Sequence, residues 1–228
     1  MASPARVAGF TLIELLVSIA VLSMVIGIST FAFSLFSRNW QGARAGYDLA
    51  AGQLQRVELL VGAIRDASAW VVFSGGPPDH LGFYFLGRDE GMTFVTESPI
   101  FEARGVAVVR VFREREENSR TWRLVYEEAP LKRMWLREAT QTLPFQNRLV
   151  ILRDLPTLEF RYFGWRSLAA RNEAMDTGSL APEWFLEYDG LIRRQQPMRI
   201  GLNLGKTEIF FDIADRDEVI LGRALGSE

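Results

Sequence analysis

An uncharged apolar run constrains the fold of this chain more than any other feature. From Leu15 to Ser37 it reads LLVSIAVLSMVIGISTFAFSLFS, without a charged residue. At 1.5 Å per residue, a helix of some twenty-odd residues spans roughly 30 Å, which matches the hydrocarbon core of a bilayer. A cleaved secretory signal has a shorter apolar region, of about 7 to 15 residues. The run therefore predicts a membrane-spanning helix, and an uncleaved single-pass anchor is its simplest form.

Composition and charge exclude several classes of function. The formal net charge of the 228 residues is −2, and the arginines are scattered among nearly as many acids, so the chain lacks a basic footprint for nucleic acid. Cysteine is absent, which rules out disulfides and thiolate metal sites. The one histidine, His80, follows a turn rich in glycine and proline, and no G-x-S-x-G motif accompanies it. We expect no cofactor, no metal and no nucleic-acid partner.

The acid at the head of the apolar run needs an explanation. Glu14 stands in GFTLIELL, directly before the uncharged stretch. A carboxylate at the centre of a membrane helix costs about 2.5 to 3.5 kcal/mol, and less near the interface, so it calls for a cationic partner. A cut between Gly9 and Phe10 would create an α-amino group about one helical turn from Glu14. That amine could pair with the carboxylate within a subunit or across subunits.

These residues resemble the N-terminus of type IV pilins and pseudopilins. Members of that family carry a short basic leader, glycine before the cut, phenylalanine after it and glutamate at the fifth mature position. The stretch FTLIELLVSIAVL is similar to the family throughout. The resemblance implies a prepilin leader at residues 1–9, cleavage by a prepilin peptidase between Gly9 and Phe10, N-methylation of Phe10 and a role for Glu14 in assembly. Residues 10–37 would then form a transmembrane helix that moves from lipid into a filament core.

The helical pattern continues beyond the apolar run, over residues 38–68. Apolar residues recur there at alternating three- and four-residue steps, while arginines fall on other faces. The stripe comprises Trp40, Ala43, Tyr47, Ala50, Leu54, Val57, Val61 and Ile64. We expect it to pack on a sheet, with an intermolecular coiled coil as the alternative.

From residue 69 to residue 228 the pattern changes to short β-type runs divided by turns. The expected strands are Trp70 to Phe73, Leu81 to Leu86, Met92 to Thr96, Val106 to Phe112, Thr121 to Tyr126, Arg133 to Leu136, Arg148 to Leu152, Leu158 to Trp165, Met198 to Leu204 and Glu208 to Ile213. Ala169 to Leu180 lacks apolar periodicity and is expected to be a mobile loop. One long helix followed by strands predicts an α+β, pilin-like fold with a mostly antiparallel sheet.

Three further features have structural explanations. The charge-rich stretch Arg110 to Arg123 has largely cancelling signs and predicts a solvated hairpin. The sequence GLNLGKTE, which begins at Gly201, resembles a phosphate-binding loop, but its glycines are one residue too close and a strand follows it, so a hairpin turn is favoured. We assign Trp122, Trp135, Trp165 and Trp184 to the core.

Residues 149–204 indicate a subgroup of the family. The series LVILRDLPTLEFRYFGW, then a tryptophan, then QQPMRIGLNL resembles the minor pseudopilin J of type II secretion systems. The positions that carry this resemblance are Leu152, Leu155, Phe160, Tyr162, Trp184, Pro197 and Ile200. It implies a single-pass protein of the bacterial inner membrane with its globular domain in the periplasm. Its partners would be the minor pseudopilins I, K and H, the major pseudopilin, the prepilin peptidase and the inner-membrane assembly platform.

Two other interpretations remain open. A minor type IV pilin that primes a surface pilus for adhesion, motility or DNA uptake would share the leader and the helix. A membrane-anchored periplasmic enzyme could use carboxylates such as Asp89 and Glu90, although these lie in a glycine-bounded turn where solvation is the usual state. We expect a protein that is not an enzyme.

Overall fold

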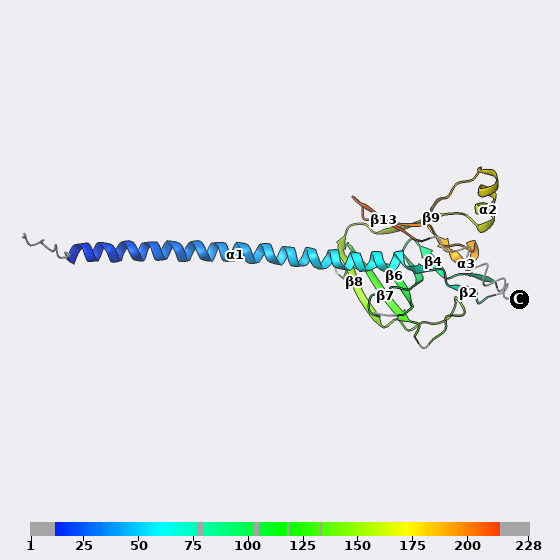
Figure 1. The fold of residues 1–228 in the computed structure, drawn as a ribbon, viewed down its shortest axis with the longest axis horizontal. Helices are drawn as coiled ribbons and strands as arrows, with labels where there is room; N and C mark the ends of the chain where they lie inside the picture. Colours follow the sequence, from blue (N-terminus) through cyan, green and yellow to red (C-terminus); the bar gives the residue numbers. More distant parts are fainter. Residues whose placement is uncertain (1–11, 77–79, 103–104, 118, 133, 215–228) are drawn as a thin grey trace, which may run out of the picture. The chain divides into compact units, whose positions relative to one another are not determined.

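The computed structural model describes residues 12–76, 80–102, 105–117, 119–132 and 134–214, and it describes the backbone but not the side chains of residues 14, 20, 32 and 34–51. A long helix precedes a β-rich region that contains two short helices (Figure 1). The elements are α1 (Leu12–Arg65), β1 (Ala67–Ser68), β2 (Val71–Phe73), β3 (Leu81–Phe83), β4 (Phe85–Arg88), β5 (Gly91–Thr96), β6 (Ala107–Arg115), β7 (Trp122–Pro130), β8 (Asn147–Leu155), β9 (Glu159–Gly164), α2 (Leu168–Thr177), β10 (Glu183–Phe185), β11 (Tyr188–Asp189), α3 (Gly190–Arg193), β12 (Arg199–Asn203) and β13 (Glu208–Asp212).

The chain divides into two compact units. The first comprises residues 1–52 and the second residues 53–228, so that α1 contributes to both. All the buried hydrophobic residues of the described chain lie in the second unit.

The strands of the second unit form three sheets in which neighbouring strands are antiparallel. A seven-stranded sheet has the order β11-β4-β5-β6-β7-β8, with β1 also paired to β5. A four-stranded sheet has the order β10-β9-β12-β13, and β2 pairs with β3. The expected α+β class, with an N-terminal helix and a mostly antiparallel sheet, is confirmed.

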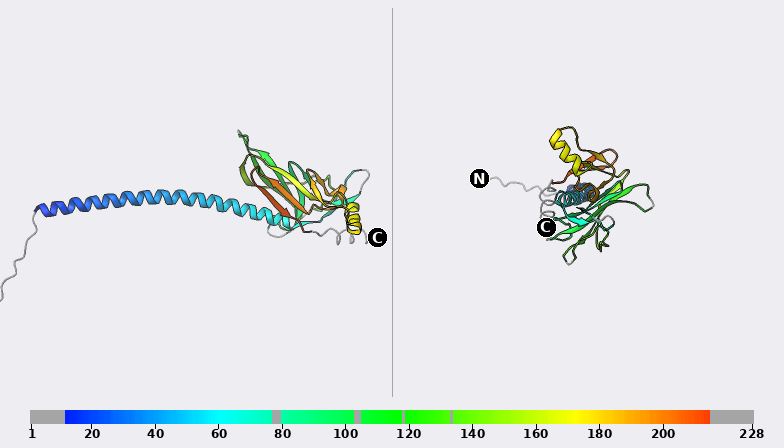
Figure 2. Two further views of the ribbon diagram at one scale, coloured as in Figure 1. Left: turned by 90° about the horizontal axis from the view of Figure 1, so that it is seen from above. Right: turned by 90° about the vertical axis from the view of Figure 1, so that its right-hand side faces the viewer.

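The main core lies where the last turns of α1 meet the two larger sheets. Leu60, Ala63 and Ile64 of α1 are at most 1% exposed and pack with buried side chains of β4 to β9 and of β12 and β13. Figure 2 shows the green strands of the larger sheet and the orange strands of the smaller sheet on different sides of the end of α1. This explains why the second half of the helix alternates apolar and polar residues, since one face is covered by sheet.

The packed face of α1 differs in part from the expected stripe. Ile64 is buried and Val57 packs against the core as expected, but Leu54 and Val61 are 66% and 38% exposed. Leu60 and Ala63 fill the core in their place. The spacing of apolar residues in α1 was compatible with packing through either face. Contacts with strands distant in sequence determine which face packs.

The opposite face of the larger sheet is covered by irregular chain together with Leu191 of the short helix α3. Val95 and Val108 point to this side and pack with Leu136, which is 3% exposed, and with half-buried residues of the segment 131–145. The strand that we expected from Arg133 to Leu136 lies in this segment and is absent from its described residues, so that expectation is wrong. Among Met134, Trp135 and Leu136, Leu136 is the buried residue. Trp135 is 75% exposed, so the expectation that it lies in the core is wrong.

Two other expectations are corrected. Ala169 to Leu180 is not a loop throughout, because α2 occupies most of it. The single strand expected from Leu81 to Leu86 is interrupted at Tyr84, since β3 pairs with β2 while β4 pairs with β5. β1, β10 and β11 were not expected, and each is three residues long or shorter.

Candidate functional sites

The residues of the N-terminal motif lie at or before the start of the described chain. Gly9 and Phe10 are outside the described residues. Glu14 is the third residue of α1, and its side chain is outside the description. The backbone of Glu14 is thus helical, and the roles of these three residues stay predictions.

Between Leu12 and Phe33, the described apolar side chains are exposed all around the helix. The exposed fractions range from 54% to 81% for Leu12, Ile13, Leu15, Leu16, Val17, Ile19, Val21, Leu22, Met24, Val25, Ile26, Ile28, Phe31 and Phe33. The hydroxyls of Ser23 and Thr30 donate at 2.8 Å to the carbonyls of Ile19 and Ile26 in the same helix, so these polar groups need no outside partner. A helix that is apolar all around is stable only when lipid or other protein covers it.

Among the helices that the structure describes, none meets the combined requirement of length and apolarity for a membrane span.

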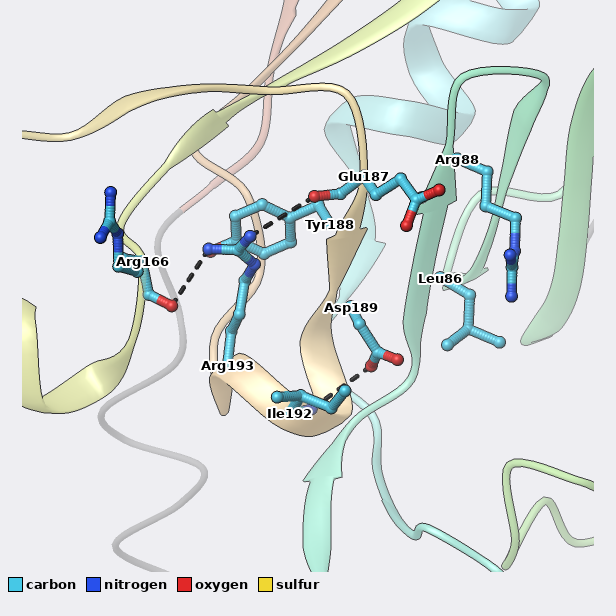
Figure 3. A pocket seen from close by; sticks show the side chains of 9 residues that line it. Leu86, Arg88, Arg166, Glu187, Tyr188, Asp189, Ile192 and Arg193 are labelled. Carbon is cyan, nitrogen blue, oxygen red and sulfur yellow. Dashed lines mark hydrogen bonds between the residues drawn. The ribbon is translucent and has the colours of Figure 1, made fainter.

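A pocket of about 330 Å³ opens in the second unit beside β4, β11 and α3 (Figure 3). Leu86 and Arg88 of β4 line one side, and Ile192 of α3, which is 73% exposed, lines another. The carboxylate of Asp189 accepts hydrogen bonds from the backbone N–H groups of Leu191 (2.9 Å) and Ile192 (3.3 Å), and so caps α3.

Arg193 also lines this pocket. Its guanidinium lies 4.6 Å from the centre of the Tyr188 ring and donates to the carbonyls of Arg166 (3.0 Å) and, at longer range, Glu187 (3.5 Å) (Figure 3). These carbonyls follow β9 of the smaller sheet and precede β11 of the larger one. Arg193 therefore connects the segments that follow β9 and precede β11, and both Arg193 and Asp189 of this pocket make structural contacts.

The carboxylates that an enzyme might use are paired with a cation. Asp89 and Glu90 form the turn between β4 and β5, and Nη2 of Arg113 lies 3.2 Å from Asp89 and 3.8 Å from Glu90. The Arg113 guanidinium also lies 5.0 Å from the centre of the Trp122 ring. Arg113 thus holds the β4–β5 turn against the hairpin formed by β6 and β7, which is a structural role.

The charged stretch from Arg110 to Arg123 forms the expected hairpin. β6 and β7 pair from Ala107 to Arg115, and Glu114 accepts from Arg123 and Arg148 at 2.5 Å each. The hydrogen bond from Arg148, followed by that from Arg123, holds the pKa of the Glu114 carboxyl below its usual range.

The other sequence features also have structural roles. His80 has its carbonyl bonded to the backbone N–H of Ser74 at 2.9 Å. Gly201 lies in β12, and the turn to β13 contains Gly205 with φ +92°, so the loop-like motif is a hairpin as expected. Within the described chain no cluster of three or more His, Cys, Asp and Glu side chains could hold a metal ion.

The residues of the subgroup resemblance lie mostly in the core. Phe160, Tyr162 and Ile200 are fully buried, and Pro197 is also buried. Leu152 and Leu155 are half-buried against the core. Trp184 is 39% exposed, so the expectation that it lies in the core is wrong. Their roles in this structure are therefore mainly packing.

Tyr162 has a second role that the sequence did not indicate. Its hydroxyl lies 2.8 Å from the carbonyls of Arg88 and Gly91, which flank the β4–β5 turn. Burial raises the pKa of this phenol well above its ordinary value, although the hydrogen bond to the Arg88 carbonyl acts to lower it. The ring lies so close to Gly87 that an added Cβ there would be 2.6 Å from it.

Comparison with known families gives one match. Residues 4–30 match the model of the prokaryotic N-terminal methylation motif, and the matched segment contains Gly9, Phe10 and Glu14. No curated protein is similar enough in sequence to count as a relative. The match supports a prepilin-like leader, methylation and a type IV pilin-like family.

Proposed function

We propose that the chain is a minor pseudopilin of a type II secretion system. It would be cut after Gly9, methylated at Phe10 and held in the bacterial inner membrane by one helix, with its β-rich region in the periplasm. With the minor pseudopilins I, K and H it would form the tip of a pseudopilus and initiate assembly of the major pseudopilin on the inner-membrane platform. On this proposal it assists export of folded proteins and is not an enzyme.

The match to the N-terminal methylation motif is the observation that carries this proposal. The continuous exposed apolar surface of α1 supports it, because such a surface is stable in lipid and, after extraction from lipid, against the helices of other subunits. Glu14 fits the same scheme, since the amine at Phe10 would neutralise it at about one helical turn. The secretion role itself rests on the resemblance of residues 149–204 to pseudopilin J.

Variants at the N-terminal motif test the proposal. Gly9→Leu should leave a membrane-held precursor, whereas Gly27→Leu is a matched control, because nothing lies within 4 Å of the position of its Cβ. Glu14→Ala should be inserted and cleaved, yet recover fewer partners in a cross-linking pull-down with I and K. Wild-type recovery with Glu14→Ala would refute the role of the carboxylate.

The alternative is a minor type IV pilin that primes a surface pilus, which the motif match supports equally. Gene neighbours discriminate between the two. A secretin and other secretion components nearby favour the pseudopilin, and genes for pilus retraction and adhesins favour the pilin. Copurification of the processed chain with I and K, and not with pilus adhesins, would support the secretion role.

A further inference from the structure

Three aromatic rings lie together on the outer face of the smaller sheet. Trp184 of β10 contacts Phe163 of β9, with ring centres 5.2 Å apart, and Phe210 of β13, with ring centres 5.7 Å apart. The residues next to them in these strands, Tyr162 and Phe211, are buried in the core on the other face. Trp184 is 39% exposed and Phe210 is 47% exposed. We call the three rings the aromatic face.

The strand beneath Trp184 carries no side chain at the point of contact. An added Cβ at Gly201 of β12 would be 3.2 Å from the Trp184 ring and 3.4 Å from the Phe210 ring. The guanidinium of Arg161 lies 5.2 Å from the centre of the Trp184 ring, and that of Arg199 lies 6.0 Å from the centre of the Phe210 ring. The rings are thus held by their neighbours while part of their surface meets solvent. A surface that is formed in advance loses little conformational entropy on binding.

The charges around the aromatic face are paired with one another. Within β9, β10, β12 and β13, all of whose residues are described, every charged side chain has a partner. The pairs are Arg161 with Glu208, Arg199 with Asp212 (2.6 Å), Glu183 with Arg166 (2.8 Å) and Glu159 with Asn203 (3.1 Å). A charged ligand would have to compete with these existing pairs. The face therefore favours a neutral ligand that can hydrogen-bond to the paired groups.

The size of the aromatic face favours a small ligand. An aromatic side chain has roughly 150 to 250 Å² of accessible surface, so the exposed parts of Trp184 and Phe210 offer roughly 200 Å². A stable protein interface buries about 800 Å² on each partner. The apolar area here is well below that value, and it suits a ligand with the dimensions of a few sugar rings.

We propose that the aromatic face binds a neutral oligosaccharide of β-linked pyranoses. In such a sugar the equatorial hydroxyls leave axial C–H bonds on both flat faces of each ring. These C–H bonds stack on the face of the Trp184 ring, whose π electrons give it a negative potential. The hydroxyls around the sugar ring accept from the Arg161 guanidinium and donate to the Glu208 carboxylate. The inference goes beyond the proposed function and does not depend on it.

Titration calorimetry of the full-length chain, in a detergent without a sugar head group, tests the proposal. The probes are cellohexaose and hexa-N-acetylchitohexaose, which share a β-1,4-linked pyranose backbone and differ in the acetamido group. Binding of both supports recognition of the pyranose ring itself, and binding of the second probe alone supports a glycan with acetamido groups. The affinity should be the same at low and high salt, because no charge is exchanged. Binding of neither probe overturns the proposal.

Variants in the same titration identify the surface that binds. Trp184→Ala should weaken binding about tenfold, whereas Trp135→Ala, at a tryptophan that is 75% exposed outside the aromatic face, should leave it unchanged. Gly201→Val should also weaken binding, because its side chain would displace the Trp184 ring. Urea unfolding checks that each variant keeps its fold.

Two results of these variants would contradict the proposal. The first is wild-type affinity in both Trp184→Ala and Gly201→Val. The second is a loss of copurification with I and K in Trp184→Ala when the wild type binds neither probe, because the face would then be a contact with a protein partner.

Discussion

The buried carboxylate of Glu128 provides the sharpest test of how the β-rich region is held together. Its Oε2 accepts from the N–H groups of Ile100 and Phe101 and from the Tyr126 hydroxyl at 2.8 Å, and the residue is fully buried. Glu128→Leu leaves the Phe101 N–H and the Tyr126 hydroxyl without this acceptor, while the Ile100 N–H keeps the Tyr126 oxygen at 3.2 Å. A stranded buried donor costs about 1 to 3 kcal/mol, and the loop at Ile100 and Phe101 can turn partly toward water, so we expect a loss of about 3 kcal/mol in unfolding free energy.

Urea unfolding of residues 38–228, followed by circular dichroism, measures this loss. Glu127→Leu is the matched control, because Glu127 is the adjacent carboxylate on the opposite face of β7 and pairs with Arg110 and Arg148, whose side chains are about 45% exposed. That variant should lose about 1 kcal/mol or less. Equal stability of Glu128→Leu and wild type would refute the view that Glu128 holds the loop.

Three other predictions follow from individual contacts. Gly87→Ala should destabilise the fold by about 1 to 3 kcal/mol in urea unfolding, because its Cβ would meet the buried ring of Tyr162; unchanged stability would contradict the packing. Glu114→Gln should make the unfolding free energy depend less on pH in the acid range. The lowered pKa of Glu114 contributes stability above its unfolded pKa of about 4.3, and that stability is lost as the pH falls through the folded pKa. If both proteins lose stability equally below pH 4, the pairing with Arg148 contributes nothing. Arg193→Ala should lose about 2 kcal/mol in the same assay, since it removes carbonyl hydrogen bonds and ring contacts together, whereas Arg194→Ala, at an exposed neighbour, should not.

Hydrophobic periodicity predicted the long helix and most strands, because their burial repeats along the sequence. It failed where stability comes from a few polar contacts. Arg171 is the buried residue of α2, so this helix has no buried apolar stripe, and its ends are set by Ser167, whose hydroxyl accepts from the N–H of Ala170, and by Gly178 at φ +65°. These capping residues were visible in the sequence and could have predicted the helix.

The segment around Leu136 shows the opposite error. Apolar residues at Met134 to Leu136 suggested a strand, but Leu136 alone is buried there. The Trp70 indole N–H donates to the Leu136 carbonyl at 3.1 Å, across 66 residues. Contacts this distant in sequence leave no local periodic signal.

The candidate sites also differ in whether the sequence alone could reveal them. The processing motif is contiguous, so Gly9, Phe10 and Glu14 could be found without a structure. The pocket beside β4, β11 and α3 is not contiguous, because it joins Leu86 to Ile192, which lie about one hundred residues apart in the sequence.

The mass of the N-terminal peptide from native membrane material shows whether Glu14 acquires its amine. The mature chain should begin at Phe10 and carry one methyl group on its α-amino nitrogen. A chain in functional assemblies that still begins at Met1 or Ala2 would contradict it, because Glu14 would then lack the amine that neutralises it.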